Sequence, residues 1–326
     1  MYGPDFTFLG IERCDLEKIE TYKDADVVIV GAPIDSGTSH RSGAKFGPQA
    51  IRMGDYLPHD GERPHLALRT DGLKDMKVVD AGDLLMNGGD LEGSLAKLAA
   101  ATEKISRAGA IAVILGGDHS IASADVAGIA NHRGKGKISM VHFDAHADTG
   151  TDQWGALVGH GTPMRRLIEN GHVRGDRFLQ LGLRGYWPDD ATLNWMRDQG
   201  MRSYEMTEIH HRGLKAVLDE SFATLTDGCD GVFLSVDIDV VDPGMAPGTG
   251  TPEPGGMTSR ELLEAVRRIC LELPVVGIDV VEVAPPFDSA DITAILANRV
   301  VLEALSAIAL RKKGGSYSPT RNLLDR

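Results

Sequence analysis

The chain alternates short apolar runs, rich in β-branched residues, with longer stretches in which apolar residues recur at helical spacing. Several of the short runs are apolar at every position, for example VVIV at 27–30 and IAVIL at 111–115. Runs of this kind are typical of parallel strands that are covered on both faces. The pattern predicts strands at residues 26–33, 77–82, 111–117, 138–148, 178–185, 202–206, 231–240 and 275–283.

Helical periodicity lies between these runs, most clearly at 90–108, 191–199, 214–225 and 258–273. The last stretch begins with Thr258 and carries Glu261 three residues later, which is the spacing of a capping box. Strands that alternate with helices favour an α/β fold, because right-handed crossovers place helices on both faces of a parallel sheet. We therefore predict an α/β sandwich around a mostly parallel sheet.

One domain is expected, since no linker, repeat or low-complexity tract divides the 326 residues. This domain should span residues 25–311, after an N-terminal extension at 1–24 and before a mobile C-terminal tail at 312–326. The N-terminus lacks a charged segment followed by an apolar one, and no apolar run approaches the ~20 residues that cross a bilayer. A cytoplasmic protein without a membrane partner is the expectation.

Composition narrows the classes of partner. The 34 Lys and Arg residues oppose 47 Asp and Glu residues, which gives a formal net charge of −13. This acidity argues against nucleic acids and anionic membranes, and it favours cations. The three cysteines, Cys14, Cys229 and Cys270, are too few and too scattered to predict a disulfide framework.

Acidic and imidazole side chains follow three of the apolar runs, at the strand ends where α/β folds bind ligands. They are His119, Asp144, His146, Asp148, Asp237 and Asp239. Alternate residues of an extended strand share a side, so Asp144, His146 and Asp148 should project together if the strand continues through them. His142 is expected on the opposite side of that strand, as a packed or supporting residue.

These side chains have the chemistry of a metal site. Carboxylates and imidazoles suit divalent first-row ions such as Mn²⁺, and no thiolate is offered to favour zinc or copper(I). Six ligands are too many for one ion that keeps an open position, but they suit two ions that share bridging carboxylates. Two ions roughly 3.5–4 Å apart can activate water as a nucleophile at neutral pH. We expect two Mn²⁺ ions, with Ni²⁺ or another divalent ion as the alternative.

Four motifs then resemble one family. GGDHS (116–120), DAHAD (144–148), SVDIDVVDPGMAPGTGTPEPGG (235–256) and EVAPP (282–286) are similar to the ureohydrolase (arginase/agmatinase) family, nearest to its agmatinase-like branch. The resemblance runs from about residue 27 to about residue 310. It implies an α/β/α domain around an eight-stranded parallel sheet, a dinuclear manganese centre, and hydrolysis of a guanidinium group to urea and an amine.

The resemblance also implies roles for individual residues. One ion would be held by His119, Asp144, Asp148 and Asp237. The other would be held by His146 and Asp239, with Asp144 and Asp237 as bridges.

Three residues take catalytic roles in the same resemblance. Glu282 matches the glutamate that grips the guanidinium, a pairing that fixes orientation when it is bidentate. His160, in GHGTP at 159–163, matches a histidine that carries a proton to the leaving amine. Asp148 is also placed to pass a proton.

The substrate is predicted from two departures from the arginase branch. Gly150 and Trp187 stand where arginases carry an asparagine and an amine-binding aspartate, which disfavours L-arginine. Tyr186, Trp187 and Trp154 suggest an aromatic mouth for an aliphatic stem or an ammonium group. Agmatine, cleaved to putrescine and urea in polyamine metabolism, is the predicted substrate.

Other readings stay open. The alternative substrates are 4-guanidinobutanoate, 3-guanidinopropanoate and small or N-alkylated guanidines; a carboxylate-bearing one would need a cation such as Arg41 or Arg184. A single-metal deacetylase of the same fold and a non-catalytic subunit are the other classes, although Asp148 and Asp239 favour two metals. The resemblance suggests homo-oligomers, either trimers or hexamers.

Overall fold

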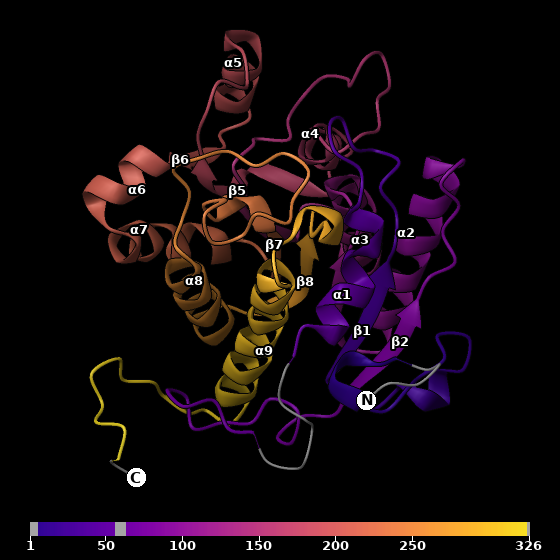
Figure 1. The fold of residues 1–326 in the computed structure, drawn as a ribbon, viewed down its shortest axis with the longest axis vertical. Helices are drawn as coiled ribbons and strands as arrows, with labels where there is room; N and C mark the ends of the chain where they lie inside the picture. Colours follow the sequence, from indigo (N-terminus) through magenta and orange to yellow (C-terminus); the bar gives the residue numbers. More distant parts are fainter. Residues whose placement is uncertain (1–5, 56–62, 325–326) are drawn as a thin grey trace.

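The computed structural model describes residues 6–55 and 63–324. Within these ranges the strands form one parallel eight-stranded sheet in the order β2-β1-β3-β8-β7-β4-β5-β6. The strands are β1 (Val27–Ala32), β2 (Val78–Asp83), β3 (Ile111–Gly116), β4 (Ile138–Phe143), β5 (Val173–Leu183), β6 (Arg202–Glu205), β7 (Gly231–Asp237) and β8 (Val275–Val281). The predicted α/β sandwich is confirmed (Figure 1).

Helices cover both faces of this sheet. One face packs against α1 (Gly47–Met53), α6 (Met206–Arg212), α7 (Leu214–Thr226), α8 (Ser259–Glu272) and α9 (Ile292–Lys312). The other packs against α2 (Leu91–Arg107), α3 (Ala122–Arg133) and α4 (Pro163–Glu169). A shorter helix, α5 (Asp190–Asp198), places Met196 in a small cluster with Ala147 and Leu183.

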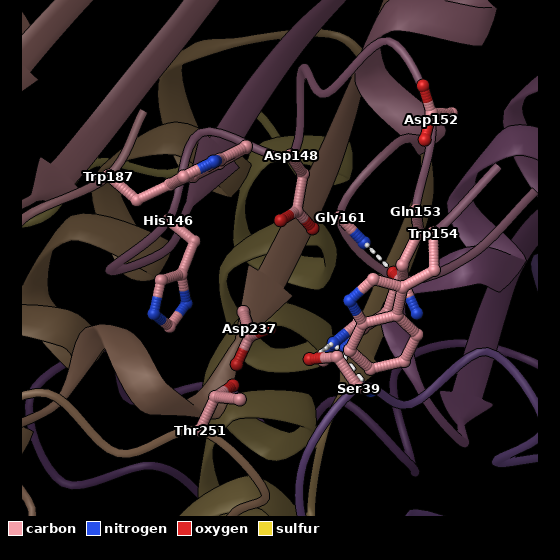
Figure 2. A pocket seen from close by; sticks show the side chains of 11 residues that line it. Ser39, His146, Asp148, Asp152, Gln153, Trp154, Gly161, Trp187, Asp237 and Thr251 are labelled. Atoms are coloured by element: carbon pink, nitrogen blue, oxygen red, sulfur yellow. Dashed lines mark hydrogen bonds between the residues drawn. The ribbon is translucent and has the colours of Figure 1, made fainter. Parts of the chain in front are cut away.

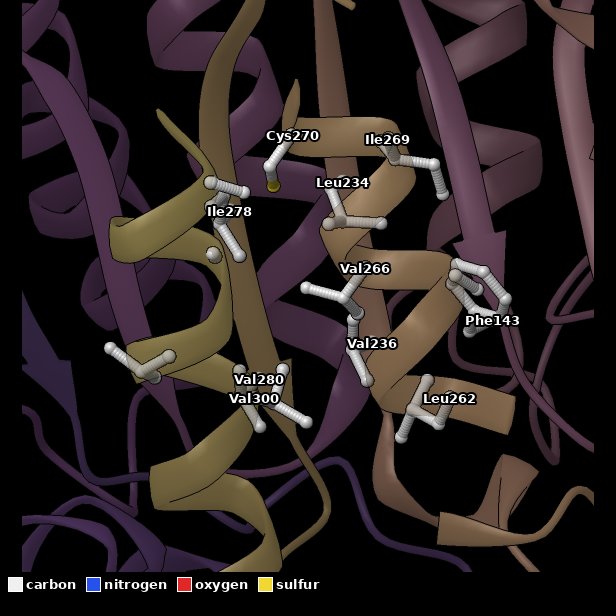
Figure 3. Packing of buried hydrophobic residues seen from close by; sticks show 14 of the residues in the cluster. Phe143, Leu234, Val236, Leu262, Val266, Ile269, Cys270, Ile278, Val280 and Val300 are labelled. Carbon is white, nitrogen blue, oxygen red and sulfur yellow. The ribbon is translucent and has the colours of Figure 1, made fainter. Parts of the chain in front are cut away.

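The central strands are buried on both sides, as their unbroken apolar runs predict. Every residue of β7 and of β8 is buried. On the α8 face, Leu262 and Val266 pack in one cluster with Val236, and α9 adds Val300 (Figure 3). The predicted capping box of α8 is present, with reciprocal hydrogen bonds between Thr258 and Glu261. Two well-packed faces hold the central strands, and therefore their ends, in fixed positions.

Two predicted strands end earlier than expected, β4 immediately before Asp144 and β7 at Asp237. The strand predicted at 138–148 stops at Phe143, where Asp144 Oδ1 accepts the His146 N–H at 2.6 Å. The strand predicted at 231–240 stops at Asp237, whose Oδ1 accepts the Asp239 N–H at 2.9 Å. These local bonds turn the chain out of the ladder. The expectation of an extended segment through 144–148 was therefore wrong.

Both ends of the described chain contact the body of the protein. Phe8 and Leu9 are buried in the core under α9, and Arg13 forms a parallel bridge with Asp80 beside β2. Beyond α9, the Tyr317 hydroxyl accepts a hydrogen bond from Arg267 Nη1 at 2.9 Å. Residues 1–5 and 325–326 of the predicted extension and tail lie outside the described residues.

Helix α9 is the one helix of the described residues that is long and apolar enough to cross a membrane. However, 72% of the most apolar 18-residue stretch of this helix is buried inside the protein. Its apolar character is explained by its contacts with α1, α8 and β8. It is a core helix of this fold.

Candidate metal centre

The candidate site lies at the carboxyl ends of four strands that are neighbours in the middle of the sheet. His119 follows β3, Glu282 follows β8, Asp237 ends β7, and Asp144 follows β4. The strand order changes direction along the chain in this region, and open parallel sheets bind ligands at such places. Motifs that are far apart in the sequence therefore meet at one edge.

His119 lies at the centre of the first group of ligands. Its Nδ1 is buried, makes none of the hydrogen bonds of the structure, and faces three carboxylate oxygens. These are Oδ2 of Asp144 at 3.1 Å, Oδ2 of Asp148 at 3.1 Å and Oδ2 of Asp237 at 3.2 Å. One imidazole nitrogen and three carboxylate oxygens thus converge on one point.

The tautomer of His119 follows from its second nitrogen. Nε2 lies 2.9 Å from the Ser235 hydroxyl, which donates its own hydrogen to Asp279 Oδ1 at 2.8 Å. Ser235 must therefore accept from Nε2–H, so in the neutral ring the lone pair of Nδ1 is directed at the carboxylates. A metal-binding histidine needs this arrangement, with a hydrogen bond that fixes the other nitrogen.

A second group shares one carboxylate with the first. His146 Nδ1 lies 3.2 Å from Asp239 Oδ2 and 3.4 Å from Asp144 Oδ1. Asp144 thus presents one oxygen to each group, as a bridging ligand would. Asp237 directs Oδ2 to the first group while its Oδ1 accepts a backbone hydrogen bond, so its bridging role stays a prediction.

His142 supports this bridge from behind. Its Nε2 lies 2.8 Å from Asp144 Oδ2, and its Nδ1 accepts a hydrogen bond from Gln180 Nε2 at 3.0 Å. Nε2–H therefore donates to the carboxylate. The prediction that His142 lies on the opposite side from Asp144 was wrong, because residues two apart along a strand share a side.

The charges in the cluster are unbalanced. Burial alone would lower the pKa of His119, but the three facing carboxylates hold it well above its usual value. Burial and the charge of Asp144 raise the pKa of Asp148, and burial with the charges of Asp239 and Asp144 raises that of Asp237. Neighbouring buried carboxylates repel one another unless a cation lies between them. The unpartnered Nδ1 and this excess negative charge fit divalent metal ions.

His160 and Glu282 form a pair beside the cluster. His160 Nδ1 lies 2.9 Å from Glu282 Oε1, which also accepts the His119 N–H at 2.9 Å. Glu282 Oε2 is buried without a hydrogen-bond partner. The backbone of Glu282 is left-handed, with φ of 62°, a strained conformation that functional sites often hold. Burial would lower the pKa of His160, but the charge of Glu282 outweighs it and raises the pKa to about 9.

A cavity of about 350 Å³ opens from the cluster (Figure 2). It is lined by Ser39, His146, Asp148, Asp152, Gln153, Trp154, His160, Gly161, Trp187, Asp237 and Thr251. Of the predicted aromatic mouth, Trp154 and Trp187 line the cavity. Tyr186 is fully exposed and is not among the lining residues. Glu282 is not among them either, but it contacts the lining residue His160.

The cavity also contains residues that the motifs did not indicate. Ser39, Asp152 and Gln153 come from loops outside the four motifs, and Thr251 lies within the 235–256 motif but was not singled out as a site residue. Close packing explains the glycine at position 150, because a Cβ there would lie 2.9 Å from Gly161 O and 3.6 Å from Trp187 Cζ2. A larger side chain at this position would crowd the wall that Trp187 forms.

Comparisons with known proteins agree with this geometry. A model of the arginase family matches residues 25–307. Proclavaminate amidinohydrolase of Streptomyces clavuligerus is 39% identical over 281 residues, 86% of this chain and 87% of the relative. Guanidinobutyrase of Pseudomonas aeruginosa is 37% identical, covering 87% and 86%, and the mitochondrial agmatinase of Gallus gallus is 37% identical, covering 93% and 88%.

Solved structures show the same relationship. The proclavaminate amidinohydrolase structure superimposes with a TM-score of 0.85 at 35% identity, covering 95% of this chain and 99% of that one. A Trypanosoma cruzi formiminoglutamase variant solved with Mn²⁺ has a TM-score of 0.81 at 25% identity, covering 91% and 97%. The family depends on metal ions, and the His/Asp cluster described above is present in this chain. The chain therefore belongs to the arginase family, and it is an amidinohydrolase that acts on a guanidino compound.

Proposed function

We propose that this protein hydrolyses agmatine to putrescine and urea and that two Mn²⁺ ions are its cofactors. The observation that carries the choice of substrate is the charge of the cavity. None of the described residues that line it is Lys or Arg, whereas its exposed lining residues are Asp152, Trp154 and Trp187. Agmatine is cationic at both ends, and carboxylates and aromatic faces both attract cations.

The two arginines that could have received a substrate carboxylate are already engaged. Arg41 donates to the carbonyl oxygens of Thr249 and Gly250 and stacks on the ring of Phe287. Arg184 donates to main-chain carbonyl oxygens, including that of Asp239 at 2.7 Å. Neither lines the cavity. This supports a substrate without a distal carboxylate.

The chemistry divides between the ions and the side chains. Bound divalent ions would polarise the guanidinium carbon and activate water at neutral pH. Glu282 Oε2, the acceptor without a partner, would take a guanidinium N–H and fix its orientation. His160, whose pKa the neighbouring Glu282 raises, would supply the proton that the departing amine needs.

One experiment tests the proposal. Urea release is measured for agmatine, 4-guanidinobutanoate, 3-guanidinopropanoate and methylguanidine, with Mn²⁺ and Ni²⁺ in parallel. We expect the highest kcat/KM for agmatine with Mn²⁺. A preference for a guanidino acid would overturn the choice of agmatine and would place this chain with relatives such as the guanidinobutyrase.

Metal content separates the remaining function classes. We expect about two manganese ions per chain and complete loss of urea release in His146→Ala. One zinc ion per chain, with activity towards acetylated amines, would instead support a deacetylase. A metal-loaded protein inactive towards every guanidine would support a non-catalytic subunit.

A further inference from the structure

We propose that the Ser39 hydroxyl is the last link in proton delivery, passing the proton from His160 to the departing amine. This inference rests on the proposed hydrolysis of a guanidino compound and adds a residue to it. Ser39 lies in the loop after β1 and belongs to none of the motifs that resemble the family's metal site.

The contacts of Ser39 form a continuous chain to a buried carboxylate. Ser39 Oγ lies 2.6 Å from His160 Nε2, and His160 Nδ1 lies 2.9 Å from Glu282 Oε1. Glu282 is almost fully buried, whereas Ser39 lines the cavity. Figure 2 shows the Ser39 side chain across the cavity from Asp237 and Thr251. A hydroxyl, an imidazole and a carboxylate thus run from the cavity into the core, the order that proton-transfer groups use in other enzymes.

The partner of Ser39 is the same in both protonation states of His160. In the neutral ring, Nε2 accepts the Ser39 N–H, which lies 3.0 Å away. In the charged ring, Nε2 can no longer accept the Ser39 N–H; instead Nε2–H can donate to Ser39 Oγ, 2.6 Å away, and the hydroxyl hydrogen is then free to point into the cavity. A hydroxyl both accepts and donates hydrogen bonds. Ser39 Oγ can therefore take the proton of His160 Nε2 while it gives its own hydrogen to the departing amine.

The loop that carries Ser39 is fixed to the site by buried contacts. The Gly37 N–H donates to Asp118 Oδ2 at 2.7 Å, and Gly37 O accepts the His160 N–H at 3.0 Å. A Cβ at Gly37 would lie 2.9 Å from Ser120 Cβ, so glycine permits this close approach. Gln153 Nε2 donates to the same Gly37 oxygen at 2.8 Å. The main chain two residues before Ser39 therefore bonds directly to the main chain of His160, which constrains the spacing of the two residues.

The relay moves two hydrogens and leaves the Ser39 hydroxyl unchanged. When the C–N bond to the departing amine breaks, its electron pair stays on the nitrogen. That nitrogen takes the hydrogen of Ser39 Oγ, while Oγ takes the hydrogen of His160 Nε2, so the hydroxyl is regenerated. His160 becomes neutral and later regains a proton from water in the cavity. Glu282 keeps its charge throughout and stabilises the charged imidazole before transfer.

The test compares Ser39→Ala with substrates whose departing amines differ in basicity. We expect kcat for agmatine to fall about 100-fold with little change in KM, because positioned acid catalysis contributes about that much. For N-(2,2,2-trifluoroethyl)guanidine, whose amine departs without full protonation, we expect a loss smaller than about fivefold. Ser39→Thr, which keeps a hydroxyl, should recover most of the agmatine activity.

Ser36→Ala is the matched control, since Ser36 is an exposed serine of the same loop whose hydroxyl donates to Gly88 O. It should keep wild-type kcat. An equal loss for both substrates in Ser39→Ala would overturn the relay and leave Ser39 as a positioning residue. Full activity of Ser39→Ala would also overturn it.

Failure of the proposed function has a different signature. A wild-type protein that is loaded with Mn²⁺ and releases urea from no guanidine would overturn both proposals. An active wild type, inactivated by His146→Ala but unaffected by Ser39→Ala, would overturn only the relay. The ¹⁵N NMR chemical shifts of labelled histidine test the hydrogen bond between Ser39 and His160 without any substrate. The His160 Nε2 signal should move in Ser39→Ala, and an unchanged signal would contradict the hydrogen bond.

Discussion

The Ser235 hydroxyl decides which nitrogen of His119 is free for a metal ion. It accepts from Nε2–H because its own hydrogen is directed to Asp279 Oδ1. Without it, His119 could adopt the other tautomer and place a proton on Nδ1, opposite the three carboxylates. A residue that contacts neither metal nor substrate therefore controls how the ligand presents its lone pair.

We expect Ser235→Ala to weaken metal binding by about 10- to 100-fold, the range found when a partner of a ligating histidine is lost. Titration calorimetry with Mn²⁺ on the metal-free protein measures the change. Ser139→Ala is the matched control, because Ser139 is buried on β4 and its hydroxyl faces Gly231 O, away from the cluster. Equal affinities in the two variants would contradict the role of Ser235.

Asp152 is an exposed residue of the cavity lining, where it would meet the distal ammonium of agmatine. It is exposed, so an ion pair there contributes about 0.2–1 kcal/mol. Asp152→Asn removes the charge and keeps an oxygen that can accept the Gly155 N–H. We expect KM for agmatine to rise about two- to fivefold at constant kcat. KM for methylguanidine, which has no distal charge, should not change; a parallel rise would contradict this placement of the substrate.

At the scale of elements, the strands were predictable because their burial is uniform. Parallel strands that are covered on both faces are apolar at most positions, and β3, β7 and β8 begin within a residue of their predicted starts. The short helix α1 and the core helix α9 were harder to predict. α9 carries apolar residues on nearly all sides, so it lacks the amphipathic stripe that marks a surface helix.

The sequence predicted which residues form the site, but not how their side chains are arranged. The motifs indicated His119, Asp144 and Asp237. The turns that end β4 and β7 depend on hydrogen bonds from main-chain N–H groups to aspartate side chains, and hydrophobic periodicity does not predict such bonds. Ser39 was not indicated at all. Its position depends on Gly37 passing close to Asp118 and Ser120, a tertiary contact with no counterpart in local sequence.

Helix α1 and strand β2 are joined by a buried ion pair. Arg52 Nε and Nη2 contact the two oxygens of Asp80 at 2.9 and 3.0 Å, and both residues are buried. Asp80 also accepts the Phe8 N–H at 2.7 Å. Removal of the arginine would leave this carboxylate buried without a counter-charge, which is strongly destabilising.

We therefore expect Arg52→Met to lower the free energy of unfolding by about 3–5 kcal/mol. Urea denaturation measures the difference. The matched control is Lys215→Met, which breaks an exposed ion pair with Asp219 on α7. Its effect should stay within about 0.5 kcal/mol. Similar losses in both variants would show that the Arg52 pair is no stronger than a surface contact.

At the scale of the whole molecule, the buried carboxylates couple stability to metal. A ligand that binds only the folded state stabilises it by about 2.7 kcal/mol when present at 100 times its Kd. We expect EDTA to lower Tm and added Mn²⁺ to restore it in a concentration-dependent way. Scanning calorimetry measures both shifts.

Asp237→Asn sharpens this prediction. The variant loses a ligand, so Mn²⁺ should raise its Tm less than it raises that of the wild type. In the metal-free protein, burial and the charges of Asp239 and Asp144 raise the pKa of Asp237, so this carboxyl group is costly to ionise in the folded state. The substitution removes that cost, so the Tm of the metal-free variant should equal or exceed the wild-type value. A metal-free Tm several degrees below the wild type would show that Asp237 stabilises the fold without metal.

The two edges of the sheet determine how copies of this chain can associate. At one edge, the Cys14 N–H donates to Asp80 O at 3.0 Å and Glu12 O accepts the Asp80 N–H at 2.9 Å, so the N-terminal segment covers β2. At the other edge, β6 is only four residues long and has charged residues at both ends. Short or covered edges resist pairing between sheets. If this chain forms the predicted trimers or hexamers, its subunits must therefore join through helices and loops, and the sheet itself should not seed aggregation.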